Sequence, residues 1–260
     1  MDQDDVPVGR VLGRREALRV LAAAGGALLL PARGAHAVLR LAAGAVPLAC
    51  VVRPQNTEGP YFVDNRLVRS DIRAEPATGE RKAGAPFDLT FVVQRVDGSA
   101  CTPIRGALVD LWQCDAQGVY SAFEDLGGQF DTRGQSFLRG QQVTGPDGAA
   151  RFSTIYPGWY GGRAVHVHFK IRVPGASDST WEFTSQLYFD DALNDRVLAR
   201  PEYAKAGPRV RNPDDGIFKR EHGDQLVLDV RPAGDGYAAT FPIGLDLADA
   251  ATGRSDAWSR

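Results

Sequence analysis

Hydrophobic and polar residues alternate along several short stretches of the chain, which is the pattern of half-buried β-strands. The longest alternation covers residues 165–173. Another covers residues 86–96 and ends at Asp97-Gly98, which is a turn signal. The same reasoning predicts further strands at residues 104–114, 137–144, 149–155, 181–189, 225–230 and 237–243.

Helical periodicity is scarce in this chain. Residues 191–198 are the one modest helix candidate, and Pro201 stands just beyond them as a stop signal. The polar, glycine-containing stretch at residues 121–139 is typical of a long functional loop. Many short strands between Gly and Pro turns predict an all-β fold, an antiparallel or mixed β-sandwich with long active-site loops and little helix. No repeat or domain boundary interrupts residues 57–247, so we expect one sandwich domain there.

The first residues differ in composition from the rest. Arg14-Arg15 leads into an apolar run at residues 20–30, and Ala35-His36-Ala37 matches a signal-peptidase site. We interpret residues 1–37 as a twin-arginine export signal, which predicts a periplasmic or extracellular protein; an amphipathic or disordered leader is the alternative. Because the apolar run is shorter than the roughly 20 residues of a spanning helix, no stable membrane anchor is expected.

Charge and cysteine content limit the partners of the 260-residue chain. The formal net charge is -2, and no cluster of Lys and Arg interleaved with aromatics follows the leader, so nucleic acid is not expected as a partner. The cysteines lack the C-x-x-C spacing of zinc sites. In an exported protein we expect a disulfide between Cys50 and Cys101, with Cys114 as a buried thiol. Residues 38–56 are expected to form an N-terminal arm, and residues 248–260 a loose tail.

Two histidines carry the strongest chemical signal. His36 belongs to the leader, which leaves His166, His168 and His222. Because His166 and His168 are separated by one residue on a predicted strand, their side chains leave the same face, with Cα atoms about 7 Å apart. Two imidazoles at this spacing can converge on one metal ion.

The missing ligands indicate which metal suits this pair. No third histidine or carboxylate is spaced nearby, and the available donors are Tyr120, Tyr156 and Tyr160. A phenolate is a hard anionic donor that favours a trivalent cation, above all Fe(III). The loop at residues 53–62 stacks turn formers around aromatic residues, which is typical of a segment that packs against a specific surface.

Four segments in order resemble the intradiol ring-cleavage dioxygenases. They are Thr-Glu-Gly-Pro-Tyr-Phe at residues 57–62 and the stretches at residues 110–121, 152–168 and 184–189. The resemblance implies a non-haem enzyme with one Fe(III) per chain, which uses O2 to open a catechol-type ring between its two hydroxyls and gives a muconate-type diacid. It is closer to exported, single-domain members, because residues 38–53 leave no room for the helical dimerisation segment of catechol-specific ones. Whether the chain forms a homo-oligomer is left open.

The resemblance also implies roles for individual residues. The iron ligands fall on Tyr120, Tyr160, His166 and His168. Tyr160 is the labile tyrosinate that accepts a substrate proton, and Arg163 and Gln186 occupy the places of the active-site arginine and glutamine. Pro60, Tyr61 and Arg163 are expected to contact the substrate.

Two alternatives remain at this point. A cupin-like Fe(II) or Zn enzyme would need a third imidazole or a carboxylate near the histidine pair. A secreted transthyretin-like β-sandwich binding module would carry the pair incidentally and would have no catalytic activity.

Overall fold

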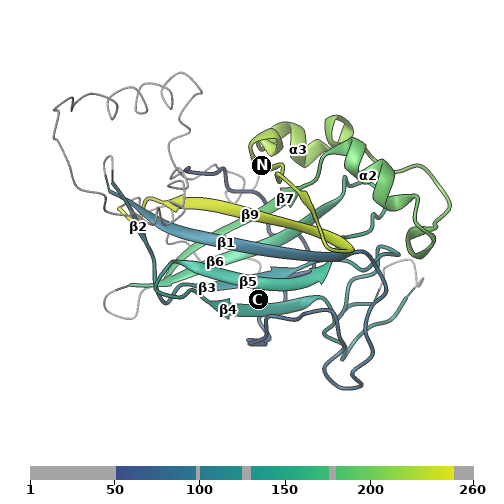
Figure 1. The fold of residues 1–260 in the computed structure, drawn as a ribbon, viewed down its shortest axis with the longest axis horizontal. Coiled ribbons are helices and arrows are strands. Elements are labelled where there is room, and N and C mark those ends of the chain that lie inside the picture. The colour runs from purple at the N-terminus through teal and green to yellow at the C-terminus, as the bar shows by residue number, and fades with distance from the viewer. Residues whose placement is uncertain (1–50, 98–99, 125–129, 176–179, 249–260) are drawn as a thin grey trace, which may run out of the picture.

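Two β-sheets pack face to face in the computed structural model, which describes residues 51–97, 100–124, 130–175 and 180–248 (Figure 1). The first sheet contains β1 (Pro86–Asp97), β2 (Ala100–Pro103), β5 (Ala149–Ile155), β8 (Arg231–Ala233) and β9 (Gly236–Leu245). The second has the order β4 (Arg139–Val143), β3 (Leu108–Trp112), β6 (His166–Pro174) and β7 (Thr180–Tyr188). Only the β1–β9 pair is parallel among the named strands. The predicted antiparallel or mixed sandwich is confirmed.

The alternation along β6 divides its side chains between core and outer face. Val167, Phe169 and Ile171 are fully buried, and the Phe169 ring lies 5.1 Å from the ring of Phe91 on the other sheet. Burying three such side chains contributes about 1.5–3 kcal/mol each. The opposite face of the same strand carries His166 and His168, so the packing of the core fixes which way the histidines point.

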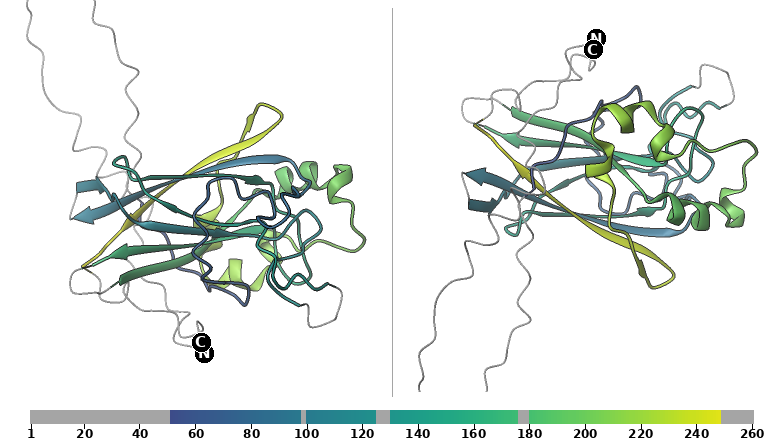
Figure 2. Two further views of the ribbon diagram at one scale, coloured as in Figure 1. Left: turned by 90° about the horizontal axis from the view of Figure 1, so that it is seen from below. Right: turned by 90° about the horizontal axis from the view of Figure 1, so that it is seen from above.

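The helices gather at one end of the sandwich, as Figures 1 and 2 show. The helix α2 (Asp191–Leu198) has the bounds expected from the sequence, and the side chain of Asp190 caps it by accepting from the Leu193 amide. A short helix, α3 (Gly216–Arg220), was not predicted and is capped by Asp215. Three 3-10 turns complete this end: η2 (Pro201–Tyr203), η3 (Asn212–Asp214) and η4 (Gly223–Leu226).

One predicted strand is wrong. Residues 225–230 instead contain the end of η4 and an extended segment with a single parallel bridge, from Val227 to Tyr188. Leu226 and Leu228 are buried against the core, which explains the misleading apolar alternation. The edge strands β2 and β8 were not predicted because all their residues are exposed and show no alternation.

Several expectations fall outside the described residues. These are the export signal at residues 1–37, residues 38–50 of the arm expected at residues 38–56, all but the first residue of the tail at residues 248–260, and Cys50. Cys101 is disulfide-bonded, as expected, and Cys114 is a free buried thiol. In the part of the chain that the structure describes, no helix is long and apolar enough to cross a membrane.

Candidate metal centre and active site

The predicted ligands meet at the end of the second sheet, on the side where the helices lie. His166 is the first residue of β6, and the strand register places Trp112 of β3 and Gln186 of β7 on either side of His168. The Trp112 indole stacks on the His168 imidazole, with ring centroids 5.1 Å apart and an interplanar angle of 10°. Rigid strands therefore hold both histidine rings.

The two imidazoles present nitrogen atoms to one point. His166 Nδ1 lies 2.7 Å from the carbonyl of Ala164, which assigns the proton to Nδ1 and leaves a lone pair on Nε2. The Nε2 atoms of His166 and His168 are 2.9 Å apart. Two imidazole ligands that each lie about 2.1 Å from one ion are about 3 Å apart at a right angle, so this spacing fits a shared metal.

Two tyrosines complete the donor set. The Tyr160 hydroxyl lies 3.1 Å from His166 Nε2. The Tyr120 ring lies edge-on to the rings of Tyr160 and His168, and its buried hydroxyl has no hydrogen-bond partner within the described structure. An unsatisfied buried hydroxyl costs about 1–3 kcal/mol, which is removed if the oxygen binds a ligand. The residues therefore fit a cation with two oxygen and two nitrogen donors.

The available donors limit which metal ion suits this place. Within the described ranges, no group of three or more His, Cys, Asp and Glu side chains could hold a metal ion. A site built on this histidine pair therefore depends on the tyrosines. Phenolates and imidazoles together favour Fe(III), whereas a cupin-like site would need a third imidazole or a carboxylate.

Burial keeps the imidazoles in the form that binds metals. Desolvation, together with the nearby Arg163 cation, lowers the pKa of His166 to about 3 and that of His168 well below its ordinary value. Both rings are therefore neutral at pH 7. Burial raises the pKa of both Tyr120 and Tyr160, so in the protein alone both phenols keep their protons. A trivalent ion supplies the charge that would ionise them.

Arg163 is held beside the ligands by a buried carboxylate. Its Nε donates to Asp215 Oδ2 at 2.9 Å, and its Nη2 donates to Gln186 Oε1. Its Nη1 lies 3.5 Å from His166 Nε2. Asp215 is fully buried and also accepts from the Ala164 amide at 2.8 Å. The guanidinium thus faces the candidate metal position with its orientation fixed.

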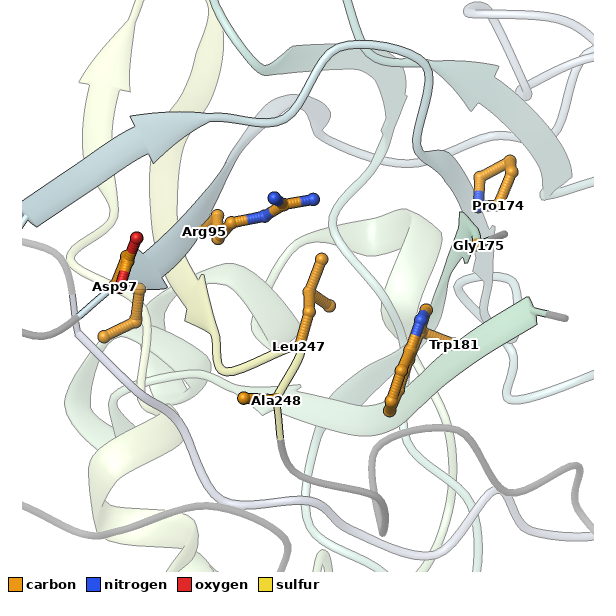
Figure 3. A pocket seen from close by; sticks show the side chains of 8 residues that line it. Arg95, Asp97, Pro174, Gly175, Trp181, Leu247 and Ala248 are labelled. Atoms are coloured by element: carbon orange, nitrogen blue, oxygen red, sulfur yellow. The ribbon is translucent and has the colours of Figure 1, made fainter. Parts of the chain in front are cut away.

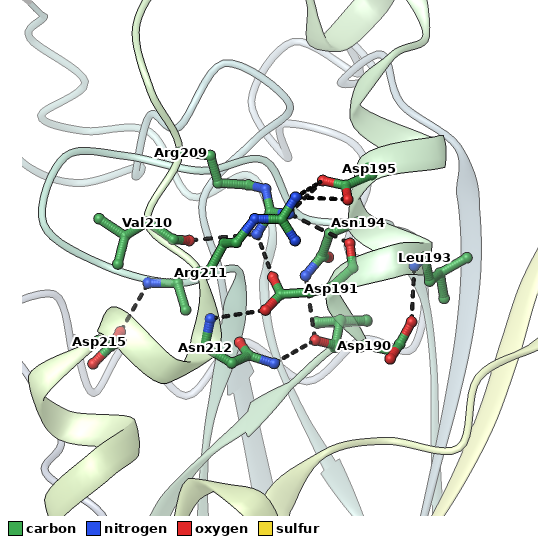
Figure 4. Close-up of polar contacts among 12 residues, drawn as sticks. Asp190, Asp191, Leu193, Asn194, Asp195, Arg209, Val210, Arg211, Asn212 and Asp215 are labelled. Carbon is green, nitrogen blue, oxygen red and sulfur yellow. Dashed lines mark hydrogen bonds and ion pairs between the residues drawn. The ribbon is translucent and has the colours of Figure 1, made fainter.

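Asp215 was hard to identify as a site residue from the sequence. The only signal is Pro-Asp-Asp-Gly at residues 213–216, which is typical of a helix start. Its other oxygen accepts from the amides of Ile217 and Phe218 and caps α3. The preceding segment is anchored on α2, where Arg209 pairs with Asp191 and Asp195 (Figure 4).

Gln186 links the arginine to the loop at residues 57–62. Its side chain is fully buried, its Nε2 donates to the Thr57 carbonyl at 2.8 Å, and its Oε1 also accepts from the Tyr188 hydroxyl at 3.2 Å. Because Gln186 bonds to both Arg163 and the loop, it fixes the position of the loop relative to the Arg163 guanidinium.

The loop at residues 57–62 covers the ligands. The Tyr61 ring stacks on the Tyr120 ring, with centroids 4.2 Å apart and an interplanar angle of 12°, and meets the Tyr160 ring edge-on at 6.1 Å. Gly59 has a φ of +72°, and a Cβ there would lie 3.2 Å from His168 Cε1. Pro60, also expected to contact substrate, is exposed between them.

Two residues considered at the sequence level lie outside the site. The Tyr156 hydroxyl donates to Asn194 Oδ1 at 2.6 Å within the core, and the exposed His222 directly precedes η4. A cavity of about 470 Å³ (Figure 3) is also separate, because Asp97 and Pro174 in its lining end β1 and β6, whereas His166 begins β6. Its labelled lining residues include Arg95, Asp97 and Trp181.

Known proteins resemble this chain in sequence. Residues 57–213, more than half of the chain, match the family model described as Dioxygenase. The catechol 1,2-dioxygenase 1 of Acinetobacter lwoffii is 30% identical over 151 residues, which are 51% of this chain and 45% of that protein. The chlorocatechol 1,2-dioxygenase of Cupriavidus pinatubonensis is 29% identical over 182 residues, which are 60% of this chain and 65% of that protein. The chain thus spans about half to two thirds of these relatives.

Solved structures resemble it over a larger share of their length. An intradiol ring-cleavage dioxygenase from Tetranychus urticae aligns with a TM-score of 0.65 and 29% identity, over 76% of this chain and 95% of that one. The dioxygenase domain of a dioxygenase carbohydrate-binding protein fusion from Streptomyces sp. SirexAA-E aligns with a TM-score of 0.52 and 30% identity, over 75% and 98%.

Proposed function

The chain belongs to the intradiol ring-cleavage dioxygenase family, and from this premise we propose that it is a non-haem Fe(III) enzyme that opens a catechol-type ring between its two hydroxyls. Both atoms of O2 would enter the product, a muconate-type diacid. The observation that carries the proposal is the convergence of two imidazole nitrogens 2.9 Å apart with a tyrosine hydroxyl 3.1 Å from one of them. The buried Tyr120 hydroxyl, which has no hydrogen-bond partner in the described structure, also supports the proposal.

Four side chains would hold one ferric ion: Tyr120, Tyr160, His166 and His168. When bound, the ion supplies a Lewis acid that ionises phenols and an electron acceptor that activates a bound catechol toward O2. Two anionic and two neutral ligands offset most of its charge and leave positions for substrate. The histidines lie on one strand, so the sheet holds the ion while loops shape the pocket.

Tyr160 and Tyr120 would have different roles. A catechol that binds as a dianion would release two protons, and one of them would need a base inside the site. Tyr160 is the more exposed of the two tyrosines and directly precedes the turn at residues 161–162, so its oxygen would be the base that accepts this proton. Tyr120 is 1% exposed and stacked beneath Tyr61, which suits a ligand that stays in place.

Arg163 and Gln186 would act on charge and orientation. The Arg163 guanidinium stays protonated and faces the site, so it can stabilise negative charge that develops on the substrate. Gln186 keeps this group aligned through its Oε1. Tyr61 and Pro60 would form the wall against which the aromatic ring packs.

The colour of the purified protein tests this proposal. Tyrosinate bound to Fe(III) absorbs visible light, so the protein with one iron per chain should be red to burgundy and should change colour when catechol is added. A panel of catechols, scored for products heavier by two oxygen atoms, would identify the substrate. A colourless protein that is fully loaded with iron would contradict the proposal. A secreted binding module predicts in addition that Tyr120→Phe and Tyr160→Phe leave the metal content unchanged.

We also propose that the chain is exported through residues 1–37. The order of Arg14-Arg15, apolar run and Ala35-His36-Ala37 supports this. N-terminal sequencing of the protein from the periplasm or medium should find a start near residue 38, whereas a cytosolic protein with an intact leader would contradict export.

A further inference from the structure

Arg139 is a buried cation that the proposed mechanism does not use. It begins β4 opposite Trp112, so its side chain lies on the same face of the sheet as His168, which pairs with Trp112 on the other side. The residue is 2% exposed. Burial lowers its pKa to about 10, so it is still protonated at pH 7.

The guanidinium joins two separate loops. Its Nη1 donates to the Tyr61 carbonyl at 2.6 Å. Its Nε donates to Ser121 Oγ at 2.8 Å, and its Nη2 donates to the Ser121 carbonyl at 2.7 Å. Its central carbon lies 5.5 Å from the centroid of the Phe123 ring. One planar group therefore binds the loop at residues 57–62 to the loop that follows Tyr120.

Both loops carry side chains of the site. Ser121 directly follows Tyr120, the candidate ligand whose hydroxyl has no partner in the described structure. Tyr61 stacks on the Tyr120 ring. The position of the Tyr120 oxygen therefore depends on the backbone of Ser121 and on the ring of Tyr61. Arg139 donates hydrogen bonds to both Ser121 and Tyr61.

The bonding pattern requires an arginine. Every acceptor of Arg139 is neutral, namely two carbonyls and a hydroxyl, and no carboxylate of the described residues pairs with it. The acceptors lie on two loops and match the planar fork of a guanidinium, which a lysine ammonium does not reproduce.

Resting on the function proposed above, we propose that Arg139 is a positioning residue for the iron site. It fixes the loops of Tyr61 and Tyr120 to each other, so that the Tyr120 oxygen stays at the ligand position and the Tyr61 ring stays against it. Loss of the fork would let the Tyr120 loop move and would weaken iron binding without removing any ligand.

The test compares iron release from the holoenzyme variants Arg139→Lys and Arg139→Gln with that from the wild type. Groups that orient metal ligands typically contribute about 10–100-fold to metal affinity, so a chelator should strip iron at least about tenfold faster from both variants. The tyrosinate-to-iron absorption band should shift or lose intensity, a change that a purely structural role would not cause.

Arg53→Lys is the matched control. Arg53 also donates to two carbonyls, those of Gln225 and Pro242, and lies over an aromatic ring, that of Phe241. None of these groups belongs to the two loops. This variant should lose some stability and should release iron at the wild-type rate.

A double-mutant cycle with Tyr120→Phe identifies the route of the effect. If Arg139 acts through the Tyr120 oxygen, adding Arg139→Lys to Tyr120→Phe should change iron release by less than about twofold. An undiminished effect in this background would overturn the proposal. So would an Arg139→Lys protein that matches Arg53→Lys in release rate and spectrum.

Ser121→Ala keeps the test decisive if the Arg139 variants do not fold. It removes the Oγ, which accepts from Arg139 Nε at 2.8 Å and also donates to the Phe137 carbonyl at 2.7 Å. Release should accelerate about two- to fivefold, in keeping with the loss of the one hydrogen bond to Arg139, about 0.5–1 kcal/mol. A folded Ser121→Ala protein with wild-type release would overturn the proposal. The wild-type iron content and colour decide the function by themselves, so failure of the Arg139 proposal is distinguishable from failure of the function.

Discussion

Asp215 shows how a single residue can determine the geometry of another one. One of its oxygens accepts from Arg163 Nε and from the Ala164 amide, and the other caps α3. The carboxylate therefore couples the direction of Arg163 to the start of a helix. Removing one partner of a buried ion pair usually costs about 3–5 kcal/mol, so the pair is also structurally important.

Asp215→Asn should separate these two roles. The amide oxygen can still cap α3, but its NH2 group would face the N–H groups of Arg163 and Ala164, which are donors as well. We expect kcat to fall about 10–100-fold while iron content stays near the wild-type value, because no candidate ligand bonds to Asp215. Steady-state kinetics and iron analysis measure the two effects.

Asp71→Asn is the control for this change. Asp71 pairs with Arg73 and Arg81, but its side chain is 40% exposed and remote in sequence from the site. It should leave kcat unchanged. Wild-type kcat in Asp215→Asn would show that Arg163 does not depend on this carboxylate.

Gly59 is a second residue of the site, and its lack of a side chain is required by its backbone conformation and by the nearby His168 ring. Its φ of +72° disfavours any residue with a Cβ, and the Cβ would press on the His168 ring. Gly59→Ala should lower the free energy of unfolding by about 1–2 kcal/mol through backbone strain, and should also accelerate iron release. Denaturant unfolding and chelator kinetics measure these effects.

Gly79→Ala separates strain from contact. Gly79 has a φ of +75°, but a Cβ there would meet no atom within 4 Å. It should lose a similar amount of stability and keep its iron. If both variants release iron at the same rate, the contact between Gly59 and His168 has no effect on the metal site.

Residues of the site differ in how far sequence alone could predict them. His166 and His168 follow from alternation on one strand, and the tyrosines follow from the lack of other donors together with the family resemblance. Asp215 and Arg139 could not be predicted, because their partners lie in distant segments that only the tertiary fold brings together. Periodicity describes which face a side chain occupies, and it says nothing about the loop that covers that face.

At the scale of elements, strands whose residues alternate between apolar and polar were predicted to within a few residues. The apolar core requires hydrophobic side chains on the core-facing side of each of these strands, so the alternation is visible in the sequence. The strands are β1, β5, β6, β7 and β9. The segment at residues 225–230 was misjudged because buried leucines alternate there without a strand partner along its length. Exposed edge strands such as β2 show no such alternation in the sequence, so they could not be predicted from it.

The helical end depends on charge pairing between α2 and the segment at residues 209–215. Arg209 bonds Asp191 and Asp195, and its side chain is 10% exposed (Figure 4). Arg209→Met should lower the free energy of unfolding by about 1–3 kcal/mol, because it removes the cation from a partly buried carboxylate. Urea unfolding would measure the change.

Arg211→Met provides the comparison. Arg211 pairs with the same Asp195, but its side chain is 50% exposed. Solvent screens such a pair, so the loss of stability should be much smaller than that of Arg209→Met. If Arg209→Met and Arg211→Met lowered the free energy of unfolding by the same amount, burial would not control the strength of these ion pairs.

At the scale of the whole molecule, the core should hold without the metal. The apolar cluster between the sheets is independent of the candidate ligands, so removing iron should leave the far-UV circular dichroism spectrum unchanged. Ligand binding to the native state alone adds stability, about 2.7 kcal/mol when the free ligand is at 100 Kd. For a chain of this size, chelation should therefore lower the Tm by about 5–10 °C.

His168→Ala serves as the control for iron removal. Because it lacks a candidate ligand, its Tm should barely respond to the chelator. Loss of the β-sheet spectrum on chelation of the wild type would show that the metal is required for the fold itself.

The parallel pairing of β1 with β9 has a consequence for how the chain folds. One edge of β1 pairs with β5 and β2, but its other edge is covered only by the last strand, from Phe87 opposite Tyr237 to Arg95 opposite Leu245. Contacts between segments so distant in sequence form slowly, because a long loop must close before they add stability. During synthesis on the ribosome, the first sheet stays incomplete until β9 has emerged. The nascent protein thus carries an open strand edge for most of its translation, and this is the period in which chaperones would be needed to prevent aggregation.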